Sequence, residues 1–374
     1  MQAVVIGGGV AGSASAIALA RAGADVTVYE AYEDPAGPVG AFVSLAVNGL
    51  RALDGLGCLA PVQAAGFAVE RQRMWSGRGR LLGDVPRGRR ADDRLRSVTL
   101  MRADLVEVLR REAVRCGARV VTGRRLAAGP GPDPLAADAD IVVGADGIWS
   151  ATRRTLDPAA PEPAYAGLYS VSGTATAAPA GAHGFNMVMA RAGAFIYLPA
   201  PDGSVWWSAQ VAAPRAPSDP ASVGPGELLG LFRDDEPVTT VLRRASGAVS
   251  ATLLHVLAPV ARRQDGRTVL VGDAAHPVGA GQGASMALED AVVLGRELAG
   301  ADGDVPAALA AFDPLRHERT AKLAKSAAAN RDAKTSGPVA ARFRDVLMPF
   351  FFNRFYERAT GWLYDFDPER VTSP

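Results

Sequence analysis

The stretch QAVVIGGGVAGSASAIALARAGADVTVYE, residues 2–30, decides the fold. Residues 2–6 are a short apolar run rich in β-branched side chains, three glycines follow, and residues 10–22 have the small and apolar side chains of a buried helix. A second apolar strand, residues 24–29, comes directly after this helix. Strand, tight turn, helix and strand form one βαβ unit, which predicts an α/β protein with a doubly wound parallel sheet.

The turn GGGVAG, residues 7–12, has the GxGxxG spacing of a dinucleotide-binding turn. In such a turn the first glycine permits the tight bend, the second lets the backbone approach a pyrophosphate, and the third lets the helix pack on the strand. The helix would present its first amides and the positive end of its dipole to phosphates. The residues expected at the pyrophosphate are Gly7, Gly9, Val10, Ala11 and Gly12.

An acidic residue, Glu30, ends the second strand about twenty residues after the turn, where an acceptor for ribose hydroxyls is expected. Its neighbour Ala31 completes the expected ribose site. The unit therefore predicts a Rossmann-like domain that binds a dinucleotide, and it does not distinguish FAD from NAD. A glycine turn with a purely structural role is the alternative.

Composition excludes several classes of protein. The 374 residues are 48% hydrophobic and 21% charged, the balance of an ordinary globular protein, and the net charge is +1 without an arm of one sign. Nucleic acid is therefore not an expected partner. Two cysteines and four scattered histidines give no metal-ligand spacing, so no metal site is expected. Neither a signal peptide nor a membrane span is visible, and a cytoplasmic protein without a membrane partner is expected.

The middle of the chain changes character between residues 165 and 211, where apolar and polar residues alternate in short segments separated by turns. This pattern predicts an antiparallel sheet, interleaved with the Rossmann-like domain, and the end of the chain has helical character. The expected division is a discontinuous cofactor domain over residues 1–70, 101–165 and 261–300, a substrate domain over 71–100 and 166–260, and a C-terminal helical segment over 301–374.

Two later motifs each follow a predicted strand: GADGIWS, residues 144–150, and VGDAAHP, residues 271–277. With these motifs the sequence resembles the flavin-dependent aromatic hydroxylases, the group of single-component flavoprotein monooxygenases that includes para-hydroxybenzoate hydroxylase. The resemblance covers most of residues 1–300. It implies that all three motifs serve one FAD.

By this resemblance Asp146 supports the pyrophosphate and helps to dock the nicotinamide donor, while Asp273 accepts hydroxyls of the ribityl chain. It also implies a glycine-containing loop near the flavin at residues 40–48. In a protein without flavin, both aspartates would only cap loops. The loop 277–280 is shorter than is usual in the family, so contacts from it to substrate are not carried over. The other implied FAD residues are Arg102, Gly272, Gly281, Gln282, Gly283 and Ala284.

The resemblance further implies the reaction. NAD(P)H reduces FAD, the reduced flavin and O2 form a C4a-hydroperoxide, and an aromatic or polycyclic small molecule is hydroxylated or epoxidised. The protein supplies a dry cavity and an orientation for the substrate. From the predicted sheet we select Tyr197, Trp206 and Gln210 as substrate-lining residues, although each is otherwise an ordinary sheet residue. Alternation places Trp206 and Gln210 on one face and Trp207 on the other.

Other interpretations remain open. A reductase or dehydrogenase on the same fold would bind FAD without inserting oxygen, and a flavin-binding scaffold would not turn over at all. The arginine-rich residues 87–96 predict a solvated hairpin or a docking patch for a phosphorylated nicotinamide cofactor. The aromatic tail, residues 343–364, predicts core packing or a subunit contact, with a cavity cap or a membrane contact as alternatives. Monomer and homodimer are both compatible with the sequence.

Overall fold

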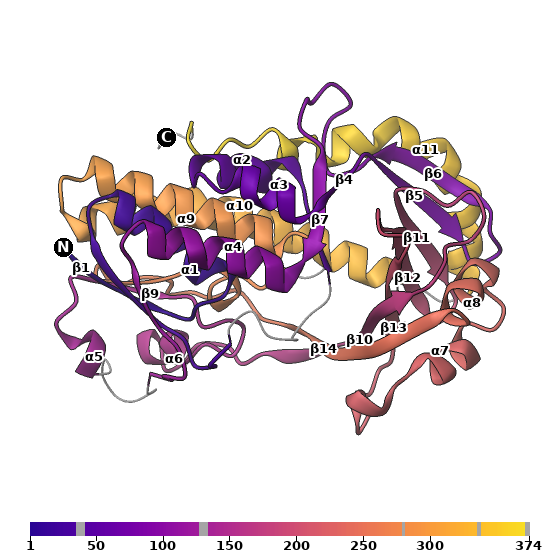
Figure 1. Ribbon diagram of the computed structural model, residues 1–374, viewed down its shortest axis with the longest axis horizontal. Helices are drawn as coiled ribbons and strands as arrows, with labels where there is room; N and C mark the ends of the chain where they lie inside the picture. Colours follow the sequence, from indigo (N-terminus) through magenta and orange to yellow (C-terminus); the bar gives the residue numbers. More distant parts are fainter. Residues whose placement is uncertain (35–41, 127–133, 279–280, 335–337, 371–374) are drawn as a thin grey trace.

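The computed structural model describes residues 1–34, 42–126, 134–278, 281–334 and 338–370. Three sheets organise this part of the chain (Figure 1). A five-stranded sheet lies at one end of the elongated molecule and a seven-stranded sheet at the other, and the long strands β10 and β14 run between the two ends. The expected loops at residues 40–48 and 277–280 lie partly outside the described residues.

The first sheet is parallel throughout, as the βαβ unit predicts. Three helices, α1 (Val10–Arg21), α4 (Arg102–Arg115) and α9 (Gly283–Gly300), pack beside it. Small residues let α1 and α9 approach closely, since a Cβ on Gly295 would lie 2.8 Å from that of Ala18. The sheet has the order β15 (Thr268–Leu270), β9 (Ile141–Gly144), β1 (Gln2–Ile6), β2 (Asp25–Tyr29) and β8 (Arg119–Val121).

The seven-stranded sheet is antiparallel over residues 165–211, as predicted, but it is larger than the alternation indicates. The strands that were not predicted to belong to it are β14 at one edge and β5 and β6 at the other, with β5 parallel to β11. Its order is β14 (Ala245–Val256), β10 (Ala164–Ala175), β13 (Val205–Ala212), β12 (Gly193–Pro199), β11 (Phe185–Ala190), β5 (Arg71–Ser76) and β6 (Leu81–Pro86).

Short helices cover one face of this sheet. Residues 218–245 form the 3-10 turn Pro220–Ser222 and two helices, α7 (Pro225–Leu231) and α8 (Glu236–Leu242). Phe232, at the end of α7, packs edge-on against Phe195 of the sheet, which in turn stacks on Trp207. This face is therefore a closed apolar core.

A small sheet joins the two large ones. It has the order β3 (Phe42–Leu45), β7 (Ser97–Met101) and β4 (Phe67–Val69), and the helices α2 (Val47–Gly55) and α3 (Leu59–Ala65) accompany it. Helix α2 packs on α9, whereas Phe42 and Phe67 contact Trp206 of the seven-stranded sheet. The small sheet thus links the five-stranded region to the inner face of the large sheet.

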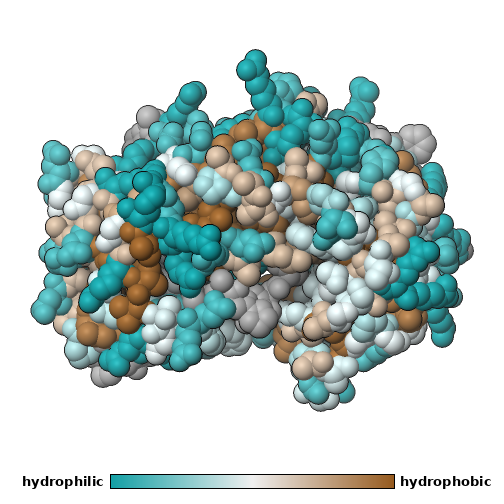
Figure 2. Space-filling model, in the orientation of Figure 1, coloured by the Kyte–Doolittle hydropathy of each residue, from teal (hydrophilic) through white to brown (hydrophobic). Residues whose placement is uncertain are grey.

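The C-terminal region is helical, as predicted. Helix α10 (Val305–Lys334) packs on α9, and α11 (Pro338–Tyr364) runs along β6 (Figure 1). The remaining short elements are α5 (Pro134–Ala137), α6 (Ala151–Leu156) and the 3-10 turn η2 (Gly272–Ala274). Among the described residues, no helix is both long and apolar enough to cross a bilayer. On the face drawn in Figure 2, apolar atoms form separate patches among polar ones.

Candidate active site

The glycine turn after β1 has the geometry that its sequence requires. Gly7 adopts a φ of +106°, and a Cβ there would lie 2.4 Å from the carbonyl oxygen of Ala145. A Cβ on Gly12 would lie 1.8 Å from the carbonyl oxygen of Gly7. Both positions exclude larger residues, so the turn brings the start of α1 close to the loop that follows β9.

The first turn of α1 has the features of an anion-binding site. Its N-cap is Gly9, no side chain caps it, and the turn holds no acidic residue. The free amides and the helix dipole therefore attract negative charge. Arg102, at the start of α4, lies over the same place, with Nη2 3.7 Å from the position of a Cβ on Gly9. This arrangement fits a diphosphate.

Glu30 holds the end of β2 to the glycine turn. Its buried carboxylate accepts hydrogen bonds from the Gly8 amide (2.6 Å) and from the Tyr32 amide (2.9 Å). Each carboxylate oxygen has a further lone pair for a hydroxyl donor. Half-buried Ala31 lies between these contacts. The placement suits a ribose acceptor, the role expected for Glu30.

Asp146 is engaged by its own loop. Its Oδ1 accepts a hydrogen bond from Ser150 Oγ (2.5 Å), and its Oδ2 accepts from the amides of Ala151 (2.8 Å) and Thr152 (2.9 Å) and from Thr152 Oγ1 (3.0 Å). Such contacts satisfy amides at the start of α6, which is the capping role considered as the alternative. The carboxylate is directed to this helix, so its effect on a cofactor would be exerted through the loop.

A second helix start lies next to the first. A Cβ on Gly272 would lie 2.8 Å from that of Ala11 in α1, and a Cβ on Gly283 would lie 3.6 Å from Asp273 Oδ1. Asp273 is exposed, yet enough protein surrounds its carboxylate to raise its pKa by desolvation. Thus Ala11, Gly272, Asp273 and Gly283 form a continuous path between the starts of α1 and α9.

The start of α9 has unused hydrogen-bonding groups. No side chain caps this helix, and its first turn contains no acidic residue. The buried atoms Gln282 Oε1 and Ser285 Oγ have no hydrogen-bond partner among the described residues. Gly281, with a φ of +102°, has open space where a Cβ would lie. Orphaned polar groups and an open glycine backbone fit the polar edge of a flavin ring better than they fit a closed core.

Behind this path lies a buried network of charges, which we call the Asp290 network: His276, Glu289, Asp290, Arg316 and Arg319. Asp290 accepts hydrogen bonds from the Gly272 amide (2.8 Å) and from Arg316 Nε (2.7 Å), and it lies 2.6 Å from His276 Nε2. Burial acts to raise the pKa of Asp290, but His276, the Arg316 guanidinium and the Gly272 amide together hold this pKa far below its usual range.

The rest of the network joins α9 to the C-terminal region. Glu289 accepts from Arg316 (2.8 Å) and from both Nε and Nη2 of Arg319 (2.7 and 2.8 Å). Arg319 also donates to the Leu363 carbonyl (2.9 Å). Sequence analysis missed this network. Its only visible signal was a pair of adjacent acids on an otherwise apolar helix, ALEDAVV.

The three residues selected as substrate-lining do not share one face. Trp206 and Gln210 lie on the inner face of the seven-stranded sheet, toward the small sheet. Tyr197 pairs with Trp207, so it lies on the opposite face, inside the core under α7 and α8. Burial there raises the pKa of Tyr197 to about 12. The selection of Tyr197 is therefore corrected: residues 196 and 198, not 197, share the face of Trp206.

The inner face combines aromatic and polar side chains. Trp206 contacts Phe67 edge-on (5.2 Å between centroids) and Phe42 (6.0 Å). Further along the same face, the hydroxyls of Ser172 and Ser208 form a hydrogen bond of 2.9 Å. An aromatic wall with a few hydrogen-bonding groups is typical of a site for a flat apolar ligand.

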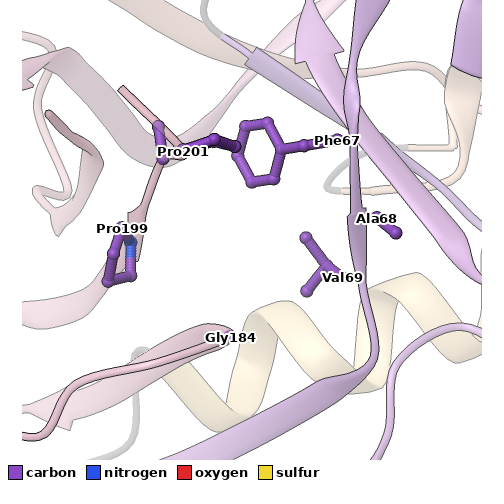
Figure 3. A pocket seen from close by; sticks show the side chains of 7 residues that line it. Phe67, Ala68, Val69, Gly184, Pro199 and Pro201 are labelled. Carbon is purple, nitrogen blue, oxygen red and sulfur yellow. The ribbon is translucent and has the colours of Figure 1, made fainter. Parts of the chain in front are cut away.

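An apolar pocket of about 420 Å³ opens beside this aromatic group (Figure 3). Phe67 and Val69 of the small sheet lie across it from Pro199 and Pro201. Its lining contains none of the residues expected to bind FAD and no charged side chain. The pocket extends the apolar surroundings of Trp206 toward the outside of the molecule.

The arginine-rich segment is not a solvated hairpin over its whole length. Arg89 is buried, and its Nη1 donates to the carbonyls of Arg90 and Ala91. Arg87 lies over the ring of Phe185.

In the aromatic tail, Leu363 and Tyr364 pack into an apolar cluster with Val47 and neighbouring residues, which is the core-packing role predicted for the tail.

Comparison with known proteins places the chain in a family. Residues 1–327 match the family described as "FAD binding domain". The aurachin C monooxygenase/isomerase of Stigmatella aurantiaca is 32% identical over 85% of this chain and 86% of its own length. The 3-hydroxybenzoate 6-hydroxylase of Klebsiella oxytoca is 29% identical over 97% of this chain and 96% of its own length.

A solved structure extends the likeness to the fold. The HpxO protein of Klebsiella pneumoniae, in complex with FAD and uric acid, superimposes with a TM-score of 0.82 at 23% identity, over 98% of this chain and 96% of that one. The glycine turn, the two uncapped helix starts and the aromatic inner face thus occur on a fold that holds FAD. This chain belongs to the FAD-binding domain family, among the FAD-dependent aromatic hydroxylases and related flavoprotein monooxygenases.

Proposed function

We propose that this protein is an FAD-dependent monooxygenase that uses NAD(P)H and O2 to hydroxylate or epoxidise an aromatic or polycyclic small molecule. One observation carries the proposal: the uncapped starts of α1 and α9 lie beside each other, joined by Gly272 and Asp273. The aromatic substrates named for relatives such as 3-hydroxybenzoate 6-hydroxylase support the substrate class.

The FAD would lie along this path. The amides of Gly9, Val10 and Ala11 and the Arg102 guanidinium would hold its diphosphate, within the turn shaped by Gly7 and Gly12, and Glu30 with Ala31 would receive the ribose. Gly272 and Asp273 would face the ribityl chain. The amides of Gly281, Gln282, Gly283 and Ala284 would face the pyrimidine edge, where the dipole of α9 favours negative charge.

When bound, FAD supplies the redox chemistry: NAD(P)H gives two electrons, one atom of O2 enters the substrate and the other leaves as water. The chain's own residues position the reactants and exclude solvent. Phe42, Phe67 and Trp206 form an apolar wall against which a flat ring would pack. Ser172, Ser208 and Gln210 on the same face offer hydrogen bonds to polar substituents.

We further propose that the cofactor domain comprises residues 1–70, 101–165 and 261–300, the substrate domain 71–100 and 166–260, and the helical segment 301–374. The three-sheet arrangement supports a discontinuous cofactor domain. We propose a cytoplasmic monomer or homodimer whose partners are its small-molecule substrate, NAD(P)H and O2, without nucleic acid or membrane.

The first experiment measures the visible spectrum of the purified protein, then NAD(P)H and O2 consumption with a panel of phenols and polycyclic aromatics. Monooxygenation predicts a flavin spectrum, stimulation of both rates by one compound, and an oxygenated product. Anaerobic electron transfer to the substrate without oxygen incorporation would instead establish a reductase. Bound flavin with no stimulated turnover by any compound would favour a flavin-binding scaffold.

The assignment of Asp273 has its own test. The variant Asp273→Ala should lose most bound FAD while the chain stays folded, because the Asp273 side chain is exposed. The measurement is the flavin-to-protein absorbance ratio, with circular dichroism as the check on folding. Asp138→Ala, which changes an exposed aspartate beyond the FAD path, serves as the matched control. Full flavin occupancy in Asp273→Ala would overturn the ribityl assignment.

A further inference from the structure

Arg87, a cation near the inner face, contacts only neutral groups in the part of the chain that the structure describes. Arg87 follows β6, and its Nη1 donates to Gln72 Oε1 (2.6 Å), while Nε lies 3.4 Å from Ser44 Oγ. The guanidinium carbon lies 3.9 Å from the centroid of the Phe185 ring. An amide, a hydroxyl and a ring face therefore surround this charge.

No carboxylate pairs with Arg87 among the described residues, although nearby arginines have one. Arg71 and Arg73, on the adjacent strand β5, share Asp84. Burial lowers the pKa of Arg87, and the titratable groups that act on it are the hydroxyls of Tyr356 and Tyr364. Its Nη2 has no acceptor in the described part of the chain. A half-buried guanidinium thus retains donors and lacks a counter-ion.

The position of Arg87 connects it to both halves of the proposed active site. Phe185, under the guanidinium, belongs to the apolar cluster that includes Trp206 and Phe67. The next residue, Gly88, accepts a hydrogen bond from the Val47 amide (2.9 Å). Val47 in turn packs with residues 278 and 286, which flank the start of α9. Arg87 therefore lies where the inner face meets the segment proposed to hold the flavin ring.

We propose that Arg87 binds a carboxylate on the ring of an aromatic substrate. The inference rests on the proposed monooxygenase function and narrows its substrate class to aromatic acids. With its face on Phe185, the guanidinium keeps its N–H edge for a carboxylate, the planar pairing for which arginine is suited. The ring of the substrate would then extend toward Phe67 and Trp206, where the apolar wall lies.

A structural role is the competing explanation: Arg87 would only tie β3 to β5 through Ser44 and Gln72. The two roles predict different results. A structural tie affects every ligand equally when it is removed, whereas a carboxylate partner affects only ligands that carry the negative charge. The discriminating quantity is therefore the ratio of the affinities for an acid and for its neutral amide.

The test measures binding to the FAD-loaded protein by the change in the flavin absorbance spectrum. The probes are benzoate, 3-hydroxybenzoate and 2-naphthoate, each beside its carboxamide. In the unaltered protein at least one acid should bind more tightly than its amide. In Arg87→Met its affinity should fall by about 30-fold or more while that of the amide is unchanged, because one partner of a desolvated charge pair is lost. Arg87→Lys should restore part of the loss.

A matched control is Arg71→Met, which removes an exposed arginine that already has Asp84 as its partner and should leave the acid-to-amide ratio unchanged. Equal affinities for acid and amide, an acid preference that survives in Arg87→Met, or no response to any of the acids would overturn the inference. Turnover of neutral aromatics with oxygen incorporation would then still support a monooxygenase. Absence of bound flavin would instead contradict the proposed function itself.

Discussion

Two groups of buried charge, the Asp290 network and Arg87, are built in opposite ways. In the network the carboxylates of Glu289 and Asp290 meet the guanidinium groups of Arg316 and Arg319 at 2.7–2.8 Å. Among the described residues, Arg87 contacts only neutral groups. Met286, in the first turns of α9, accepts a hydrogen bond from Arg316 and packs with Val47, whose amide donates to Gly88, the residue after Arg87. The two groups are thus connected through α9 but differ in their partners.

The two groups of charge differ in how the cost of burying them is compensated. A buried ion is costly unless its partners compensate for the lost hydration, and each member of the network has such partners within the chain. The network therefore fixes α9 to α10 and to the last turn of α11, and with them the Gly272 amide. Arg87 is left to be compensated by a ligand.

The largest expected effect is on the network. Arg316→Met removes the guanidinium that Glu289 and Asp290 share and leaves buried negative charge in excess, which should lower the free energy of unfolding by roughly 3–5 kcal/mol. Urea denaturation followed by circular dichroism measures it. Arg370→Met, at an exposed arginine paired with Asp367, is the control and should change little. A loss below about 1 kcal/mol for Arg316→Met would show that the network is not the structural tie described here.

The contacts of the Asp290 network could not be predicted from the sequence. The βαβ unit, the glycine turn and the alternation of Trp206 and Trp207 could be predicted, because each depends on neighbours within a few residues. Asp290 and Arg316 lie on different helices, and no local pattern says that they meet. The same limit explains Tyr197. Alternation gives two faces of a strand, but only the packing of α7 and α8 decides which face is the closed core.

Local contacts also determine the surroundings of two other features that the sequence singled out. Asp146 was assigned through a family motif, but four donors at the start of α6 take up its carboxylate. The arginine-rich segment resembled a solvated hairpin because composition cannot show that Phe185 and Gln72 would enclose Arg87. In both cases the residue type indicated a polar or charged role, and the groups packed around the side chain determined which role it has.

An intermediate effect is expected at a buried acid without a partner. Asp235 precedes α8, its side chain has no hydrogen bond or cation among the described residues, and burial with nearby Asp234 raises its pKa to about 6. Since this pKa is higher in the folded than in the unfolded chain, the stability associated with protonated Asp235 is lost as the pH rises through about 6.

Asp235→Asn should remove this pH dependence. At about pH 8 the variant should be more stable than the unaltered protein, on the order of 1–3 kcal/mol, and at about pH 4.5 the difference should be small. Thermal and urea unfolding at the two pH values measure it. Asp234→Asn is the control, because Asp234 is exposed. Equal effects of Asp235→Asn at both pH values would contradict the raised pKa.

The smallest effect on stability is expected at Arg87 itself, in the protein without an aromatic ligand. Arg87→Met loses a hydrogen bond to Gln72 and the contact with the Phe185 ring, but it also relieves the chain of a desolvated cation, and methionine packs well against an aromatic ring. These contributions oppose each other, so the free energy of unfolding should change by less than about 1 kcal/mol. Urea unfolding of the two proteins at equal flavin occupancy measures it. A loss of roughly 3–5 kcal/mol, as expected for Arg316→Met, would instead make Arg87 a structural tie whose charge the fold itself requires.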